Sequence, residues 1–258
     1  MRRRHLLATL AAGSLLPAAA QADERSPQTL RSAARQATVY LFPLYEMACL
    51  RWANTVDETN PQRQRLNRFR HYTDLADHRL QPLGLPNCDT LYSSAWLELG
   101  TEPMFLTVPP VGDLYYCYAV FDLFANTVGT VSHRQHGGDP PTHMIVGPAW
   151  DGTRPSDIRL IRSTTNSAWL LGRVLVDGPE EIDRARILQA RALLETPDQR
   201  NERRILEAGE LMRYRTVAPT EPVADWPTPH PSDPFDLFDI GLQALGEGPL
   251  PDLSLIHI

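Results

Sequence analysis

The stretch Thr90-Leu-Tyr-Ser-Ser-Ala-Trp-Leu-Glu-Leu99 is the first of a series of short apolar runs, and this series decides the fold class. Turn-forming pairs such as Gly112-Asp113, Gly137-Gly138 and Asp151-Gly152 separate the runs, as they separate strands in all-β domains. Six strands within about 90 residues predict an antiparallel β-sandwich. The other expected strands are Met104–Val108, Leu114–Phe124, His143–Val146, Ile158–Ile161 and Trp169–Val176.

Helical patterns flank these strands on both sides. Apolar residues recur at helical spacing over Gln28–Asn54, and the internal Pro43 predicts two helical pieces that meet at a kink. After the strands, a helix begins at Pro179 and runs to about Glu195, and a second covers Asp198–Met212. A short helix follows Ser232 and ends near residue 245. The fold class is therefore α+β, with a β-sandwich flanked by N-terminal and C-terminal helices.

The expected organisation has six parts. A signal peptide comes first, then a helical segment, the sandwich, a second helical segment, a proline-rich linker that leads into a helical connector, and a short tail. The ranges are 1–22, 23–86, 87–178, 179–215, 216–252 and 253–258.

The first 22 residues predict export from the bacterial cytoplasm. Arg2, Arg3 and Arg4 precede an apolar stretch, Leu6–Leu16, and a run of small residues places the cleavage site near Ala22. The apolar stretch is about half the roughly 20 residues that a membrane span needs. The arginines also resemble a twin-arginine signal, beside the general export route. We therefore expect a periplasmic protein with no stable membrane span after cleavage.

Charge and composition exclude several functions. The chain has no lysine, which removes Schiff-base, pyridoxal-phosphate and phosphate-loop chemistry. Loss of the three signal arginines would take the formal charge from −6 to −9, which argues against nucleic acid as a partner. The cysteines, Cys49, Cys88 and Cys117, have no paired spacing, so separate core thiols are favoured over a Cys88–Cys117 disulfide.

The last six residues, Leu253-Ser-Leu-Ile-His-Ile258, match the translation of a sequencing adapter. We interpret them as adapter and expect the natural protein to continue. The alternative is a natural apolar tail.

Polar residues at the mouth of the first strand form one candidate site. Asn87, Asp89, Tyr92 and Trp96 could line a ligand-facing rim, with Asp89 as a general base. The favoured alternative is structural: Asp89 opens the strand through an Asx-turn, and the aromatic rings fill the core.

Asp122 and Asn126 form a second candidate, because they place a carboxylate and an amide within an apolar run. A buried Asp122 needs a partner, and Arg173 could form a structural clamp with it. Alternatively, Asp89 and Asp122 could divide acid and base roles as a catalytic pair.

Asn166, Trp169 and Arg173 lie together near the last strand, where Arg173 could bind a substrate carboxylate. A buried ion pair is the favoured alternative. His133 and His136 have spacing compatible with a metal, but the glycines and prolines around them indicate a mobile loop, so no metal site is predicted.

Five ordered motifs together resemble the domain-of-unknown-function family DUF1254, over about residues 36–195. The resemblance implies an immunoglobulin-like sandwich and, usually, a second domain of the DUF1214 family, which we expect to follow in the natural protein. It implies no settled activity. The motifs are Asn67-x-Phe69-x-His71, Pro86-Asn-x-Asp-Thr-Leu-Tyr-Ser93, Tyr115-Tyr116 with Asp122 and Thr127, Val146-Gly-Pro-x-Trp150, and Thr165-Asn166-x-x-Trp169-x-Leu-Gly-Arg173.

Three functions remain open. The leading hypothesis is a protein that binds a small polar or carbohydrate-like molecule, because amides, carboxylates and aromatic rings cluster without a nucleophile elbow. The alternatives are a hydrolase or lyase that uses carboxylates, and a structural envelope module. No cofactor is expected.

Overall fold

A computed structural model describes residues 27–77, 87–207 and 226–249, so the predicted signal peptide, the tail and the first part of the linker, residues 216–225, lie outside the described residues. The chain divides into two units, residues 1–38 and 39–258. The described part of the first unit, residues 27–38, is wholly helical and almost wholly exposed. No described helix is both long enough and apolar enough to span a membrane.

Helix α1 (Pro27–Thr55) is one continuous helix, where the sequence predicted two helical pieces that meet at a kink at Pro43. Pro43 lies inside the helix, where an isolated proline is usually disruptive, but the packed second half of the helix continues past it. From Leu41 onward, side chains that are three or four residues apart are buried, which fits the period of 3.6 residues per turn. This buried stripe includes a charged residue, Arg51.

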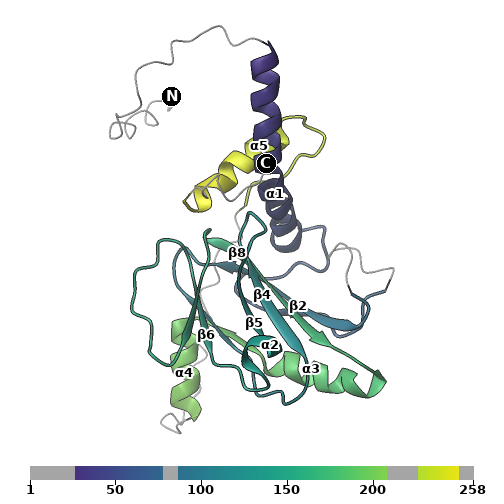
Figure 1. The fold of residues 1–258 in the computed structure, drawn as a ribbon, viewed down its shortest axis with the longest axis vertical. Helices are drawn as coiled ribbons and strands as arrows, with labels where there is room; N and C mark the ends of the chain where they lie inside the picture. Colours follow the sequence, from purple (N-terminus) through teal and green to yellow (C-terminus); the bar gives the residue numbers. More distant parts are fainter. Residues whose placement is uncertain (1–26, 78–86, 208–225, 250–258) are drawn as a thin grey trace. The chain divides into compact units, whose positions relative to one another are not determined.

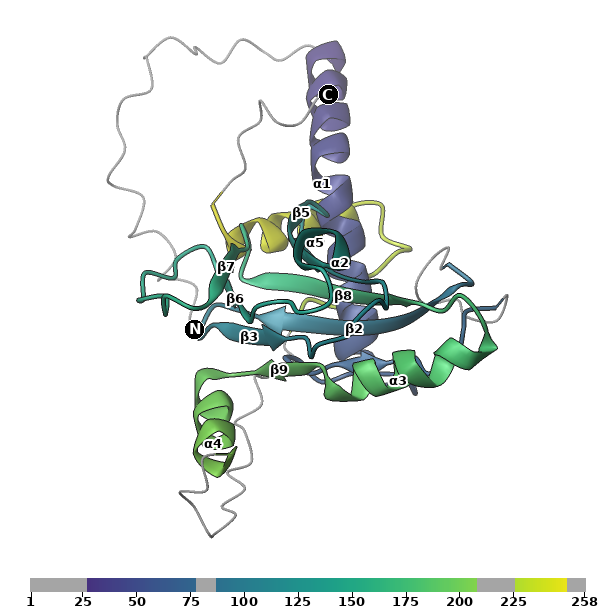
Figure 2. The same cartoon turned by 60° about the horizontal axis from the view of Figure 1, so that its bottom comes forward.

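Two sheets make up the centre of the second unit (Figures 1 and 2). The five-stranded sheet has the order β1-β2-β8-β4-β5 and the four-stranded sheet the order β7-β6-β3-β9. The strands of the first are β1 (Arg70–His71), β2 (Thr90–Glu98), β4 (Tyr116–Phe121), β5 (Thr127–Ser132) and β8 (Ser167–Leu175). Those of the second are β3 (Met104–Thr107), β6 (His143–Val146), β7 (Arg159–Arg162) and β9 (Leu193–Glu195).

The sheets pack through alternating side chains. Along β2, Leu91, Ala95 and Leu97 join a core with Met104 and Leu106 of the other sheet. At this face Gly172 of β8 makes room for a neighbour, because a Cβ atom there would lie 2.5 Å from the Tyr118 ring. The sandwich is therefore packed by ordinary period-two patterning, with glycine where a neighbouring side chain needs the space.

The α+β prediction is confirmed: two packed sheets carry helices at both ends of the chain. One part is wrong, because β6 and β7 pair in parallel rather than antiparallel. The sheets also reach beyond the expected range of 87–178, since β1 and β9 are edge strands outside it. The segment 133–136, expected as a mobile loop, is the short helix α2 (His133–His136).

Three helices follow the strands. Helix α3 (Ile182–Arg191), preceded by the 3-10 turn η1 (Pro179–Glu181), contributes Ala185 and Leu188 to the core between the sheets. The helix that was expected to run to Glu195 ends at Arg191, because Leu193–Glu195 form β9. Helix α4 (Pro197–Glu207) follows this strand.

The C-terminal helix α5 (Asp236–Ala244) ends in the 3-10 turn η2 (Leu245–Glu247) and lies beside the second half of α1 (Figure 1). Ile240 and Ala244 share a core with Leu44 and Ala48 of α1. The expected linker ends in packed structure, because Trp226 is buried in the same core.

Candidate functional site

Asp122, predicted as a clamp or a catalytic carboxylate, organises the loop after β4. It is fully buried, and its Oδ1 accepts the backbone N–H groups of Phe124 and Asn126, both at 2.9 Å. Its Oδ2 accepts the Asn126 side-chain amide at 3.2 Å and the Thr164 hydroxyl at 2.6 Å. Ala125 has a φ of 61°, a conformation that non-glycine residues rarely adopt, and these bonds hold it there. The carboxylate therefore has a structural role.

The two predicted catalytic carboxylates do not meet. Asp89 is exposed just before Thr90, which pairs with Leu175, whereas Asp122 follows Phe121, which pairs with Trp169. Six residues along one strand correspond to roughly 20 Å. No Asx-turn bond forms either, since the Asp89 side chain has no hydrogen bond within the described ranges.

The Asp122–Arg173 clamp is wrong for the same reason. Arg173 pairs with Tyr92 on one side and Cys117 on the other, four residues along β8 from Trp169, or roughly 13 Å. Among the described residues, Arg173 has no carboxylate within 4.0 Å.

The two tryptophans of the predicted site stack on each other. The rings of Trp96 and Trp169 lie 6.0 Å apart at 14°, and the Trp169 indole donates to the Ser94 hydroxyl at 2.9 Å. Because Trp96 is fully buried, it offers no platform for a sugar ring. The alternative that these rings fill the core fits the structure.

The predicted amides are dispersed. The Asn87 backbone N–H donates to the Tyr92 hydroxyl at 2.7 Å, so Asn87, Tyr92 and Arg173 do gather at one end of β2. Asn126 is exposed in the Asp122 loop. Asn166 lies at the other end of the sheet, where its backbone N–H donates to the Glu247 carbonyl at 2.8 Å.

A pocket of about 330 Å³, called here the His71 pocket, lies beside β1 and β9. His71 also lines an adjoining hollow of about 350 Å³. The ring of His71 packs on Phe69 at 5.3 Å between centroids. The residues that line the His71 pocket are Asn67, Arg68, Phe69, His71, Ala192, Leu193, Leu194, Glu195 and Gln199.

Asn67 sets the direction of the chain that carries Phe69 and His71. Its φ is 58°, a left-handed conformation that asparagine tolerates better than most residues. Its backbone N–H donates to the Trp96 carbonyl, and its side-chain oxygen accepts the Glu98 N–H, both at 2.8 Å. The side chain thus continues the ladder of β2, and two residues later Phe69 reaches the pocket.

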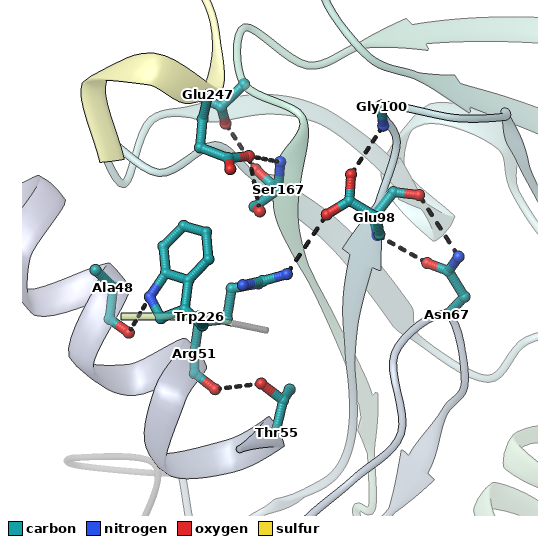
Figure 3. A network of polar contacts seen from close by, with 10 residues as sticks. Ala48, Arg51, Thr55, Asn67, Glu98, Gly100, Ser167, Trp226 and Glu247 are labelled. Atoms are coloured by element: carbon teal, nitrogen blue, oxygen red, sulfur yellow. Dashed lines mark hydrogen bonds and ion pairs between the residues drawn. The ribbon is translucent and has the colours of Figure 1, made fainter. Parts of the chain in front are cut away.

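A buried charge network holds Glu98 in turn (Figure 3). Arg51 of α1 is 2% exposed, lies 4.0 Å from the Trp226 ring, and pairs with Glu98 at 3.4 Å. Burial raises the pKa of Glu98, while the Gly100 N–H and Arg51 oppose the rise. Glu247 of η2 accepts the Ser167 N–H and hydroxyl at 2.9 Å. Figure 3 shows Arg51 of α1 joined through Glu98 to Asn67, which lines the wall of the pocket.

The opposite wall is built by β9 and the start of α4. Glu195 is 8% exposed and forms a two-pronged ion pair with Arg203, at 2.7 and 3.0 Å. Thr196 and Gln199 form a reciprocal capping box, which fixes Gln199 beside the pocket. The negative charge of this wall is thus already matched.

His71 is held from behind by Ser93. Its Nδ1 lies 2.9 Å from the Ser93 hydroxyl, which also accepts the Gln189 amide at 3.2 Å. Ser93 needs an acceptor for its own proton, and Nδ1 is the acceptor within reach among the described residues. The network therefore assigns the ring proton to Nε2. Burial lowers the pKa of the His71 imidazole, which keeps the ring neutral near pH 7.

The Nε2–H group of His71 has no partner among the described residues and is left to donate to a ligand. Ser93 is fully buried, so its hydroxyl is a support for the ring rather than an accessible nucleophile. The sequence carried a signal for this site: the alternation Asn67-x-Phe69-x-His71 places polar and aromatic side chains at period two, within the segment 23–86 that was expected to be helical.

The other histidines and the cysteines form no comparable site. The rings of His136 and His143 lie 5.1 Å apart, and across the described ranges no three side chains of His, Cys, Asp or Glu gather as a metal site would need. All three cysteines are free, so the Cys88–Cys117 disulfide is absent, and Cys88 is exposed rather than in the core.

A family model described as "Protein of unknown function (DUF1254)" matches residues 66–196, a range that begins before β1 and ends after β9. No curated protein matches the sequence.

Two solved structures are similar. The VPA0106 protein from Vibrio parahaemolyticus is 18% identical, with a TM-score of 0.54 over 75% of this chain and 44% of that chain. An uncharacterized protein from Burkholderia cenocepacia is 15% identical, with a TM-score of 0.35 over 87% of this chain and 50% of that chain. This chain thus spans half or less of their lengths, and the first likeness shows a shared fold.

Proposed function

The chain belongs to the DUF1254 family, and on that premise we propose that it binds a small neutral polar ligand in the His71 pocket. One observation carries this proposal: the His71 ring, whose Nδ1 is matched by Ser93 and whose Nε2 has no partner among the described residues, lines a pocket of about 330 Å³. The size is at the lower end of the range for small-molecule sites. Asn67 and Gln199 supply further polar groups, and Phe69 supplies an apolar wall.

A neutral ligand fits the charges of the pocket better than an ion. The pocket has two charged lining residues: Glu195 is already paired with Arg203, and Arg68 also has an interaction within the chain. Burial lowers the pKa of His71, so its ring is neutral near pH 7. A hydrogen-bond acceptor such as a sugar hydroxyl or an amide carbonyl would match the Nε2–H group. Catalysis has less support, because Nε2 carries a proton rather than a basic lone pair and the two predicted catalytic carboxylates lie at opposite ends of β8.

The test is a thermal-shift screen of the purified chain with monosaccharides and small amides. We expect at least one compound to raise the melting temperature of the wild type and of the control variant His230→Ala, in which an exposed histidine is removed. The same compound should not stabilise His71→Ala. Equal stabilisation of all three proteins, or no stabilisation by either class of compound, would contradict the proposal.

We also propose that the protein is exported to the periplasm, with Arg3 and Arg4 as a twin-arginine signal. The acidic charge supports a small molecule rather than nucleic acid as its partner. In an expressing bacterium, mass spectrometry of the periplasmic fraction should find a chain that begins at Asp23. Changing both arginines to lysine should retain the protein in the cytoplasm, and a periplasmic chain that still begins at Met1 would count against cleavage. Two further predictions from the sequence stay predictions: that the sandwich is immunoglobulin-like, and that the protein is a structural envelope module.

A further inference from the structure

The other face of the five-stranded sheet carries a second polar group, separate from the His71 pocket. Tyr92, Arg173 and Cys117 lie opposite one another on β2, β8 and β4, so their side chains project from the same face. Ser93, which supports His71, projects from the opposite face because successive residues of a strand alternate. The two sites therefore share a sheet but no side chain.

Arg173 carries a charge that nothing in the described ranges balances. Its guanidinium lies 5.7 Å from the centre of the Tyr92 ring, and its Nε is buried without a hydrogen bond. The acidic residues nearest in the strand register, Asp89 and Asp177, are exposed and lie beyond 4.0 Å. A buried donor without a partner is costly, and native proteins leave few of them.

A second guanidinium adds to the positive charge. Arg134 of α2 is exposed, and both Arg134 and Arg173 act to lower the pKa of the Cys117 thiol against the effect of burial, which raises it. The register agrees: Cys117 pairs with Arg173 on β8 and with Ser132 on β5, two residues before Arg134. In the described part of the chain neither has an ion pair.

Two hydroxyl groups complete the set. The Tyr92 oxygen accepts the Asn87 N–H at 2.7 Å, which leaves its own proton free to donate. Thr90, two residues earlier on the same face, has a buried hydroxyl without a partner. A guanidinium and two hydroxyl donors with no carboxylate between them are the groups that recognise an oxyanion.

We propose that Arg173, Tyr92 and Thr90 form a binding site for a small oxyanion. A planar carboxylate is the best match, because a guanidinium presents parallel N–H groups that fit both carboxylate oxygens, and the Tyr92 ring lies beside it. Phosphate and sulfate are also oxyanions, but they would interact with the same arginine mainly through its charge. This proposal concerns a charged ligand and does not depend on the neutral ligand of the His71 pocket.

The experiment measures thermal unfolding of the full chain with acetate, succinate, phosphate or sulfate, each against sodium chloride at equal ionic strength. We expect a saturable rise in melting temperature. Arg173→Gln should weaken the apparent affinity by about 10-fold to 100-fold, the range expected for loss of a charge-assisted hydrogen bond. Arg173→Lys should weaken succinate more than phosphate, because it keeps the charge and loses the fork.

The control variant is Arg184→Gln, which removes an exposed arginine paired with Asp113 and Glu181 and should respond as the wild type does. This comparison corrects for the general stabilisation by sulfate and phosphate. Equal responses of wild type and Arg173→Gln, or no response beyond that to chloride, would overturn the proposal. So would loss of the response in His71→Ala, since the anion would then bind in the other pocket.

Discussion

The charged groups at the two ends of strand β8 differ in how fully they are hydrogen-bonded. Beside Trp169, the Asp122 carboxylate accepts four hydrogen bonds, and both of its oxygens are matched. Four residues further along, Arg173 keeps a buried Nε with no partner and no carboxylate within 4.0 Å among the described residues. In the sequence, both residues are charged groups within apolar runs, and an ion pair between them was one interpretation of that pattern.

The difference separates a structural charge from a candidate functional one. A buried carboxylate with all its acceptor sites filled has no capacity left for a ligand, and its bonds fix the local backbone. Arg173 is half-buried, and because its Nε has no hydrogen bond and no carboxylate lies within 4.0 Å among the described residues, it has donor capacity left for a ligand. The same test distinguishes the two sides of His71, where Nδ1 is matched by Ser93 and Nε2 is open.

The largest loss of stability is expected on substitution of Asp122, whose carboxylate is fully hydrogen-bonded. Asp122→Ala would leave four donors without an acceptor and release the loop that holds Ala125 at a positive φ. We expect the free energy of unfolding to fall by about 3 kcal/mol or more, as when a buried hydrogen-bond network is broken. Urea unfolding measures this loss. Ligand responses at Arg173 should persist wherever the variant remains folded.

Asp139→Ala is the matched control, because Asp139 is an exposed carboxylate in a neighbouring loop. Its removal should change the free energy of unfolding by less than about 0.5 kcal/mol. If Asp122→Ala were equally mild, the four hydrogen bonds would contribute little, and hydrogen-bond matching would not identify structural charges in this fold.

The sequence predicted most of the strands because period-two and continuous apolar patterns follow from burial on a sheet. Thr90–Glu98 and His143–Val146 appear where expected. β5 was missed, since Thr127–Ser132 is only partly buried at an edge of the sheet and lacks an apolar pattern. β1 and β9 are two and three residues long, too short for any period to show, and they form only by pairing with β2 and β3.

The sequence predicted some residues of the candidate sites but not their partners. Residue type marked Tyr92 and Arg173 as candidate site residues, but in two separate groups, and only the pairing of β2 with β8 brings them together. Which groups would be paired depended on strand register, and period two cannot supply register between distant strands. The support of His71 by Ser93 and Gln189 brings together residues from three elements, and no local pattern encodes such a meeting.

The smallest change in the free energy of unfolding is expected on substitution of Arg173. This substitution tests the comparison most directly. Arg173→Met removes a partly buried charge that has no ion pair in the described chain and leaves an unbranched side chain against Tyr92. Because replacing a buried charge by an apolar residue is often neutral or stabilising, the free energy of unfolding should stay within about 1 kcal/mol of wild type. Urea unfolding in a buffer free of oxyanions makes the measurement.

The same substitution at Arg203 provides the contrast. Arg203 holds Glu195 with two short contacts, so Arg203→Met leaves a carboxylate that is 8% exposed without its partner. We expect that variant to lose about 1 to 3 kcal/mol. If Arg173→Met lost as much as Arg203→Met, Arg173 would have a stabilising partner in the fold. The clamp interpretation would then return with a carboxylate other than Asp122, and the case for an open oxyanion site would end.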